Sequence, residues 1–175
     1  TILSSAGSGA IWVYDDARTF GVDGWTDVGP DTTHVEIANN VISGTSVAIR
    51  AQGSSTTAPN TEPSQFFDVV DTDAFFRQSG PTQDIVYWIP ATTPVHYTTL
   101  AAFQAAQGAD KEAHGIDVSS GGDPFFGDAA GGDYTIKATS TAHASGRALP
   151  ADVAAALGLT TTTVVDRGAL HWPGH

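Results

Sequence analysis

A strand, a Ser- and Gly-rich turn and a second strand recur along this chain every 37 to 38 residues. Segment 1–12 aligns with segment 40–50, so that Ile11 falls on Ile49. A looser third copy places Val86 over Ile49. A recurrence of this length is typical of solenoid proteins, in which each repeat adds one unit to a continuous core. The spacing therefore predicts parallel strands that stack, with Ile11, Ile49 and Val86 in one inward column.

Two further segments, 34–40 and 67–73, alternate apolar and polar residues. A period of two indicates half-buried strands, and the Asn and Asp residues that end both segments suit turns. Hydrophobic residues make up 41% of the chain but charged residues only 15%, and Gly, Ser and Thr fill the difference. That mixture is typical of a turn-rich β protein.

The chain divides into two regions within a length that fits one domain. Residues 1–96 are expected to hold the coils with long loops, and residues 97–175 a final coil, two short helices and a C-terminal cap. Thr98 should N-cap a helix over 98–108, and Pro150 should begin a helix over 150–158. The predicted fold is therefore an all-β, right-handed parallel β-helix of about three coils, closed by two short capping helices that cover its open edge.

Several phrases between residues 34 and 175 resemble the C-terminal part of bacterial right-handed parallel β-helix repeat proteins, of the pectate-lyase or polysaccharide-active type. The phrases are Asp73-Ala74-Phe75-Phe76, Val86-Tyr87-Trp88, 100–104, His114-Gly115-Ile116, 123–126, 132–136 and 166–170. The resemblance implies the architecture more specifically than any chemistry. Members of that family carry many more coils upstream. We therefore expect the upstream part of the same protein, or a separately cleaved chain, to complete this one.

The residues that follow the inward column are expected to point outward and to stack on one another: Trp12, Arg50 and Tyr87. Tyr14 and Gln52 would form a second column beside them. Aromatic faces next to a guanidinium and an amide suit sugar binding, because rings pack on sugar C–H faces while polar groups bond the hydroxyls. These five residues are the candidate substrate-binding set. The alternative is a column that is packed beneath a loop.

Asp15 and Asp16 are adjacent carboxylates that could act as acid and base in glycoside hydrolysis. With His34 and Arg50 they complete the candidate catalytic set, in an order that faintly resembles polygalacturonases. The glycines expected around the His and the Ile-Lys expected after the Arg are missing. The alternative is that the two aspartates begin a turn. Thr1 could also be an N-terminal nucleophile, unless its position at the start is accidental.

No metal site is predicted, and calcium is the one candidate cofactor. Asp23, Asp27 and Asp31 share a Gly- and Pro-rich loop whose carboxylates and carbonyls suit this ion. Asp128 and Asp133 are further candidate calcium ligands. The alternative in both places is solvated loop aspartates. The chain has no Cys, and its histidines lack the spacing of zinc ligands.

The net charge of −12 rests on only seven Lys and Arg. We therefore expect no nucleic-acid partner, and without a long apolar run we expect no membrane insertion. The chain begins at Thr1 almost within a repeat, so we expect a processed or truncated product. The leading hypothesis is part of a secreted or cell-surface carbohydrate-active protein, a hydrolase or lyase of an extracellular polysaccharide. The alternative is a non-catalytic glycan-binding or structural surface module. Either would have a polysaccharide or an oligosaccharide as its partner.

Overall fold

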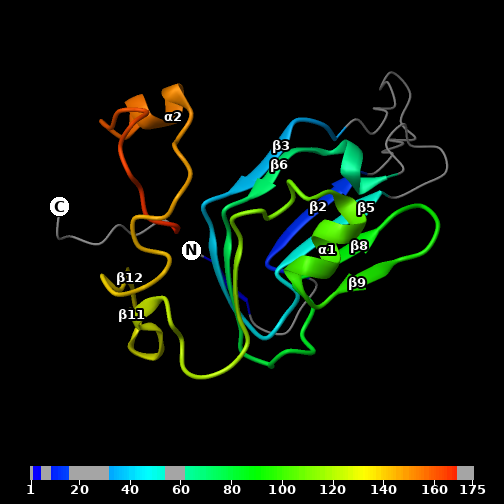
Figure 1. Ribbon diagram of the computed structural model, residues 1–175, viewed down its shortest axis with the longest axis horizontal. Coiled ribbons are helices and arrows are strands. Elements are labelled where there is room, and N and C mark those ends of the chain that lie inside the picture. The colour runs from blue at the N-terminus through cyan, green and yellow to red at the C-terminus, as the bar shows by residue number, and fades with distance from the viewer. Residues whose placement is uncertain (1, 5–8, 16–31, 54–61, 169–175) are drawn as a thin grey trace, which may run out of the picture.

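In the part of the chain that the structure describes, the strands form four small sheets (Figure 1). The computed structural model describes residues 2–4, 9–15, 32–53 and 62–168. The first sheet is parallel, in the order β1 (Ile2–Ser4), β4 (Val41–Gly44), β7 (Ala74–Arg77) and β10 (Ile116–Val118). A second parallel pair consists of β3 (Val35–Ala38) and β6 (Phe67–Asp71).

The other four-stranded sheet is mixed. Its order is β2 (Ile11–Asp15), β5 (Ile49–Gly53), β8 (Val86–Ile89) and β9 (Val95–Tyr97). The first three strands are parallel, and β9 returns antiparallel to β8. Ile11 pairs with Ile49, and Ile49 pairs with Val86. The register that the recurrence predicted for these three strands is therefore confirmed.

The predicted right-handed parallel β-helix, with its last three coils, is wrong. The strands are divided among separate sheets that do not curl into a solenoid of stacked coils. After β8 the chain turns back into the antiparallel strand β9, and β11 (Phe126–Asp128) with β12 (Asp133–Ile136) forms an antiparallel pair. The resemblance to bacterial β-helix proteins is contradicted by the same finding. A period-two pattern specifies which residues face inward along a strand, but it does not specify how sheets are joined.

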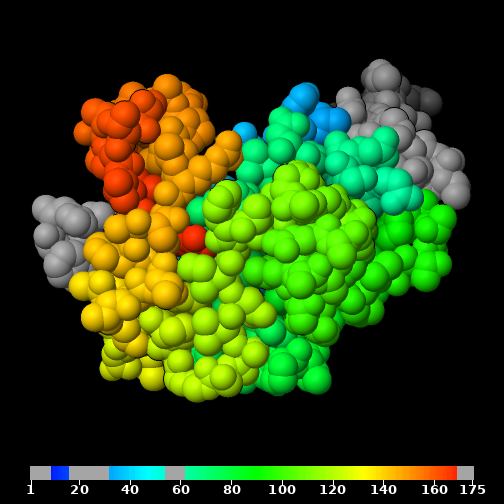
Figure 2. Space-filling model, viewed as in Figure 1, coloured from blue at the N-terminus to red at the C-terminus, as the bar shows by residue number. Residues whose placement is uncertain are grey.

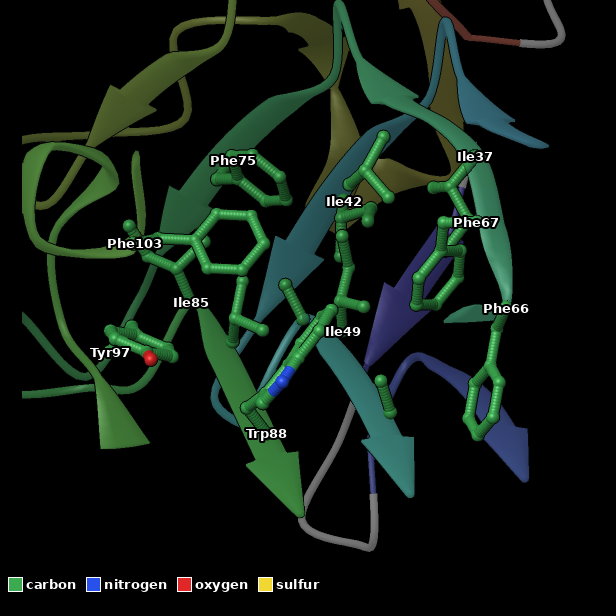
Figure 3. Close-up of a cluster of buried hydrophobic side chains, with 14 residues drawn as sticks. Ile37, Ile42, Ile49, Phe66, Phe67, Phe75, Ile85, Trp88, Tyr97 and Phe103 are labelled. Carbon is green, nitrogen blue, oxygen red and sulfur yellow. The ribbon is translucent and has the colours of Figure 1, made fainter. Parts of the chain in front are cut away.

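The main hydrophobic core lies between the sheets and beneath a helix (Figure 3). Trp88 is almost fully buried, and its ring centre lies 5.8 Å from that of Phe67 and 5.5 Å from that of Phe103. Aromatic rings at such separations add packing energy to the burial of their large surfaces. The alternation along β5 and β8 follows from this core, because Ile49, Ala51, Val86 and Trp88 face it while their neighbours face outward.

Helix α1 (Leu100–Gln107) covers this core through Phe103, which is fully buried. The Thr99 side chain caps it by accepting a hydrogen bond from the Ala102 amide at 3.1 Å, one residue later than the predicted Thr98. The second helix, α2, spans Ala151–Ala156 and begins after Pro150. Both helices thus occur where they were predicted, but they do not cap a solenoid. In the described ranges no helix is long and apolar enough to span a bilayer.

The C-terminal segment, yellow to red in Figures 1 and 2, packs beside the sheets and builds a second core. Phe125, Phe126 and Ile136 of this segment pack with Val41 and Phe76. All four residues of β4 and of β7 are therefore buried, since this sheet is covered on both faces. Two short 3₁₀ turns complete the described elements, at Pro63–Gln65 and Ala129–Gly131.

Candidate functional site

Four side chains form a row across the outer face of the sheet β2–β5–β8–β9. Trp12 pairs with Arg50, Arg50 with Tyr87, and Tyr87 with His96 in the strand register. We call these four residues the outer row. Residues directly opposite one another on neighbouring strands point to the same side of a sheet. The register therefore places one indole, one guanidinium, one phenol and one imidazole side by side.

The members of the outer row touch one another. The guanidinium carbon of Arg50 lies 4.3 Å from the centre of the Trp12 ring and 5.5 Å from that of Tyr87. Both distances are within the range of a cation–π interaction. The rings of Tyr87 and His96 are stacked, with centres 4.2 Å apart and planes 17° apart. The row is therefore a continuous platform of flat groups.

Tyr14 and Gln52 lie beside the outer row and pair with each other in the register. The Tyr14 ring centre is 5.8 Å from that of Trp12. The side-chain Oε1 of Gln52 accepts a hydrogen bond of 2.9 Å from Nη2 of Arg50, which holds the guanidinium in place. Trp12 is 49% exposed and Tyr14 is 40% exposed. These two rings are thus accessible at the surface, so the five candidate binding residues are brought together on one face.

The candidate catalytic residues are not gathered in the same way. Asp15 is fully buried on the inner side of β2, and its Oδ1 accepts a hydrogen bond from the Thr32 amide at 3.0 Å. His34 is exposed before β3, in another sheet, and its Nδ1 lies 2.9 Å from Oδ2 of Asp68. Asp16 lies outside the described residues, as does Thr1. Arg50 alone of the candidate catalytic residues is placed on the outer row.

The candidate calcium ligands Asp23, Asp27 and Asp31 also lie outside the described residues. Asp128 and Asp133 are described, and each uses its carboxylate within its own turn. Asp128 accepts from the Gly131 amide and Asp133 from the Thr135 amide. In the part of the chain that the structure describes, no three His, Asp or Glu residues cluster as metal ligands would.

A buried acid pair is the feature that sequence reasoning missed. Asp73, directly before β7, and Glu112, after α1, are almost fully buried. Oε2 of Glu112 accepts a hydrogen bond from the Asp73 amide at 3.2 Å. Burial first, and then the charge of Asp73, raises the pKa of Glu112 to about 10. Burial also raises the pKa of Asp73. Oδ2 of Asp73 and Oε1 of Glu112 have no hydrogen-bond partner among the described residues.

The buried guanidinium of Arg167 completes this cluster. Its Nη1 donates to the Asp73 carbonyl at 2.9 Å, and its Nε donates to Oγ of Ser145 at 3.0 Å. The cluster is closed to solvent, because Asp73, Glu112 and Arg167 are each less than 5% exposed. It therefore joins the C-terminal segment to the sheets and has no access for a substrate. No sequence signal pointed to it, since its members lie 39 and 55 residues apart along the chain.

In comparisons with known proteins, no protein-family model, no curated protein and no solved structure matches this chain. Function therefore has to follow from the geometry of the site, and the outer row is the part of that geometry which faces solvent.

Proposed function

We propose that this protein binds a polysaccharide or oligosaccharide chain along the outer row, with Tyr14 and Gln52 beside it. One observation carries the proposal. The guanidinium of Arg50 is held between the rings of Trp12 and Tyr87, while Trp12 itself stays half exposed. A group of exposed aromatic side chains on one face is a feature of ligand-binding surfaces.

The chemistry of the row matches the two kinds of surface that a sugar presents. Aromatic rings pack against the C–H faces of a pyranose, and guanidinium, amide and imidazole groups exchange hydrogen bonds with its hydroxyls. Neighbouring strands lie roughly 4.8 Å apart. The row of four strands therefore extends roughly 14 Å, which is long enough for a few linked sugar units.

The same geometry supports binding more than cleavage. Acid and base catalysis of glycoside hydrolysis needs two carboxyl groups roughly 5 to 10 Å apart across the scissile bond. Asp15 points into the protein instead of toward the row, and His34 belongs to another sheet. We thus propose that the chain is a glycan-binding module. We also propose that it belongs to a secreted or cell-surface protein.

The test is a screen of the chain against a panel of soluble polysaccharides, followed by calorimetric titration of the best binder. Trp12→Ala should weaken binding by roughly 1–3 kcal/mol, by analogy with stacking of bases on aromatic side chains. The free energy of unfolding should fall by only about 1 kcal/mol, because the ring is half exposed and takes part in one exposed cation–π pair.

Val164→Ala is the matched control, since it also shortens an exposed apolar side chain but lies far along the chain from the row. Its affinity should be unchanged. A Trp12→Ala protein that loses stability but keeps full affinity would contradict the proposal. Release of reducing ends or of unsaturated products during the screen would instead show cleavage.

A further inference from the structure

A polar pocket of about 550 Å³ opens beside the outer row. It lies on the turns that lead from β4 into β5 and from β7 into β8. Seven residues line it: four have hydroxyl side chains, and the others are Val47, Gln83 and Asp84. The pocket therefore offers many small hydrogen-bonding groups beside a substantial apolar surface, a lining that suits a sugar unit.

The walls of this pocket are held by internal hydrogen bonds. Nε2 of Gln83 donates to the Ser46 carbonyl at 2.6 Å, and Oε1 of Gln83 accepts from the Ser79 amide at 3.0 Å. These bonds tie the two turns to each other. The two turns are therefore already ordered before a ligand binds. A preformed site loses less free energy to ordering on binding.

Arg77 holds the turn between β7 and β8 in place. It is almost fully buried, and all three nitrogens of its guanidinium donate hydrogen bonds. Nη1 donates to the carbonyls of Pro81 at 2.7 Å and Gln83 at 3.1 Å, while Nε and Nη2 form a bidentate pair with Asp117, both at 2.7 Å. Bidentate charged pairs fix geometry as well as adding energy. The shape of the pocket is therefore built into the fold.

The pocket adjoins the outer row at two places. Oδ2 of Asp84 in its wall lies 2.5 Å from Nδ1 of His96, and His96 is stacked on Tyr87. The backbone of Gly9 also lies next to Val47 of the pocket and to Arg50 of the row. A Cβ at Gly9 would lie 3.5 Å from Cγ1 of Val47 and 3.2 Å from Cβ of Arg50, and its φ of +143° disfavours any other residue.

We propose that this pocket is a second subsite, which takes one uncharged sugar unit of the chain whose neighbouring units lie on the outer row. This inference rests on the proposed function. The pocket lining contains a carboxylate and no Lys or Arg, and the whole chain carries a net charge of −12. Sugar hydroxyls can donate to Asp84, whereas a uronate carboxylate would be repelled by it. The preferred ligand is therefore a neutral oligosaccharide.

The test compares short and long ligands of one neutral linkage, taken from the best binder among glucose, xylose and mannose oligomers. In the unmodified protein the hexasaccharide should bind at least about fivefold more tightly than the disaccharide, since a filled pocket adds one or more hydrogen bonds. Hexagalacturonate should bind more weakly than the neutral hexasaccharides.

Thr82 is an exposed residue of the pocket lining, so Thr82→Tyr places an aromatic ring in the pocket. It should reduce hexasaccharide affinity to the disaccharide level and leave disaccharide affinity unchanged. Thr45→Tyr fills the pocket from the other turn and should do the same, which guards against one variant failing to fold. Thr161→Tyr, at an exposed position in the C-terminal segment, is the control and should match the unmodified protein.

The outcomes separate the two proposals. If hexasaccharide affinity survives in the folded Thr82→Tyr and Thr45→Tyr proteins, the pocket is no subsite, although binding on the row still stands. Equal affinity of the unmodified protein for disaccharide and hexasaccharide would overturn the subsite in the same way. If hexagalacturonate binds as tightly as the neutral sugars, the exclusion of charge is wrong. If no sugar binds to the unmodified protein, both proposals fail.

Discussion

The guanidinium carbon of Arg50 lies 4.3 Å from the centre of the Trp12 ring, on the neighbouring strand and directly opposite in register. This pairing positions the indole without burying it. Gln52 holds the other side of the guanidinium through a hydrogen bond of 2.9 Å. Arg50 is thus the positioning residue of the outer row, and it lies between its two aromatic neighbours.

Replacing Arg50 with Ala should therefore loosen Trp12 and Tyr87 together. Exposed cation–π pairs contribute about 0.5–1 kcal/mol each, so the free energy of unfolding should fall by about 1–2 kcal/mol. Affinity for the oligosaccharide should also fall. Urea denaturation and calorimetric titration measure the two effects. Arg147→Ala, which removes an exposed guanidinium 3.8 Å from Glu36, should leave affinity unchanged. Equal sugar affinity for Arg50→Ala and the unmodified protein would exclude this role.

Phe103→Ala should destabilise the protein by about 3–5 kcal/mol, as large-to-small changes of buried aromatic residues do. Phe103 is fully buried, and its ring centre lies 5.5 Å from that of Trp88 and 5.4 Å from that of Tyr97. Chemical denaturation followed by tryptophan fluorescence measures the loss. Leu157→Ala, at a position 62% exposed, should cost far less. Similar losses for the two variants would mean that α1 does not cover the core as described.

The sequence predicted the local part of this fold well. Period-two alternation and the recurrence of Ile11, Ile49 and Val86 identified three strands and their parallel register, because each strand buries one face. The predicted cap residues Thr98 and Pro150 marked the starts of the two helices to within a residue or two. These features depend on neighbours along the chain, or on the repetition of one pattern.

The arrangement of the sheets depends on contacts between distant segments, which no local sequence pattern reveals. The antiparallel return of β9, and the burial of β4 on both faces by Phe125 and Phe126, are set by distant segments. Trp12, Arg50 and Tyr87 of the outer row were predicted from register alone. His96 was missed because β9 does not belong to the recurrence. The pocket was missed because its lining comes from two turns whose Ser and Thr residues are ordinary turn residues.

Glu112 should make stability depend on pH. Its pKa is raised from an ordinary value of 4.5 to about 10 in the folded protein, chiefly by burial. Above pH 4.5 the unfolded chain loses this proton while the folded protein keeps it. The stabilising contribution is therefore complete below the unfolded pKa and is lost as pH rises toward the folded pKa, by up to about 1.4 kcal/mol per pH unit.

Glu112→Gln isolates this effect, because an amide is uncharged at every pH. The free energy of unfolding of the unmodified protein should fall relative to that of Glu112→Gln between about pH 5 and pH 9. Denaturant titrations at several pH values give the difference directly. Glu36→Gln, at an exposed carboxylate on β3, should run parallel to the unmodified protein. A constant difference between Glu112→Gln and the unmodified protein across this range would show that Glu112 is ionised when folded.

Arg167 should hold the C-terminal segment against the sheets. Its guanidinium is buried beside Asp73 and donates to the Asp73 carbonyl, and the next amide, of Gly168, donates to the Asn39 carbonyl at 2.7 Å. Asn39 also exchanges two hydrogen bonds with the backbone of Arg147. Arg167→Met removes the cation and leaves the Asp73 charge buried without a counter-ion, a change that typically costs about 3–5 kcal/mol. Limited proteolysis should then cut the C-terminal segment faster than the sheets.

A second substitution tests whether charge, and not lost packing, causes this destabilisation. Asp73→Asn removes the buried negative charge and keeps the Oδ1 acceptor that receives the Asn40 amide at 2.7 Å. The double variant Asp73→Asn with Arg167→Met should therefore be more stable than the sum of the two single losses predicts, with a coupling of at least about 1 kcal/mol. Strict additivity in urea denaturation would mean that Arg167 acts through packing and its backbone hydrogen bond alone. In that case the C-terminal segment should become equally sensitive to protease in Arg167→Met and in the double variant.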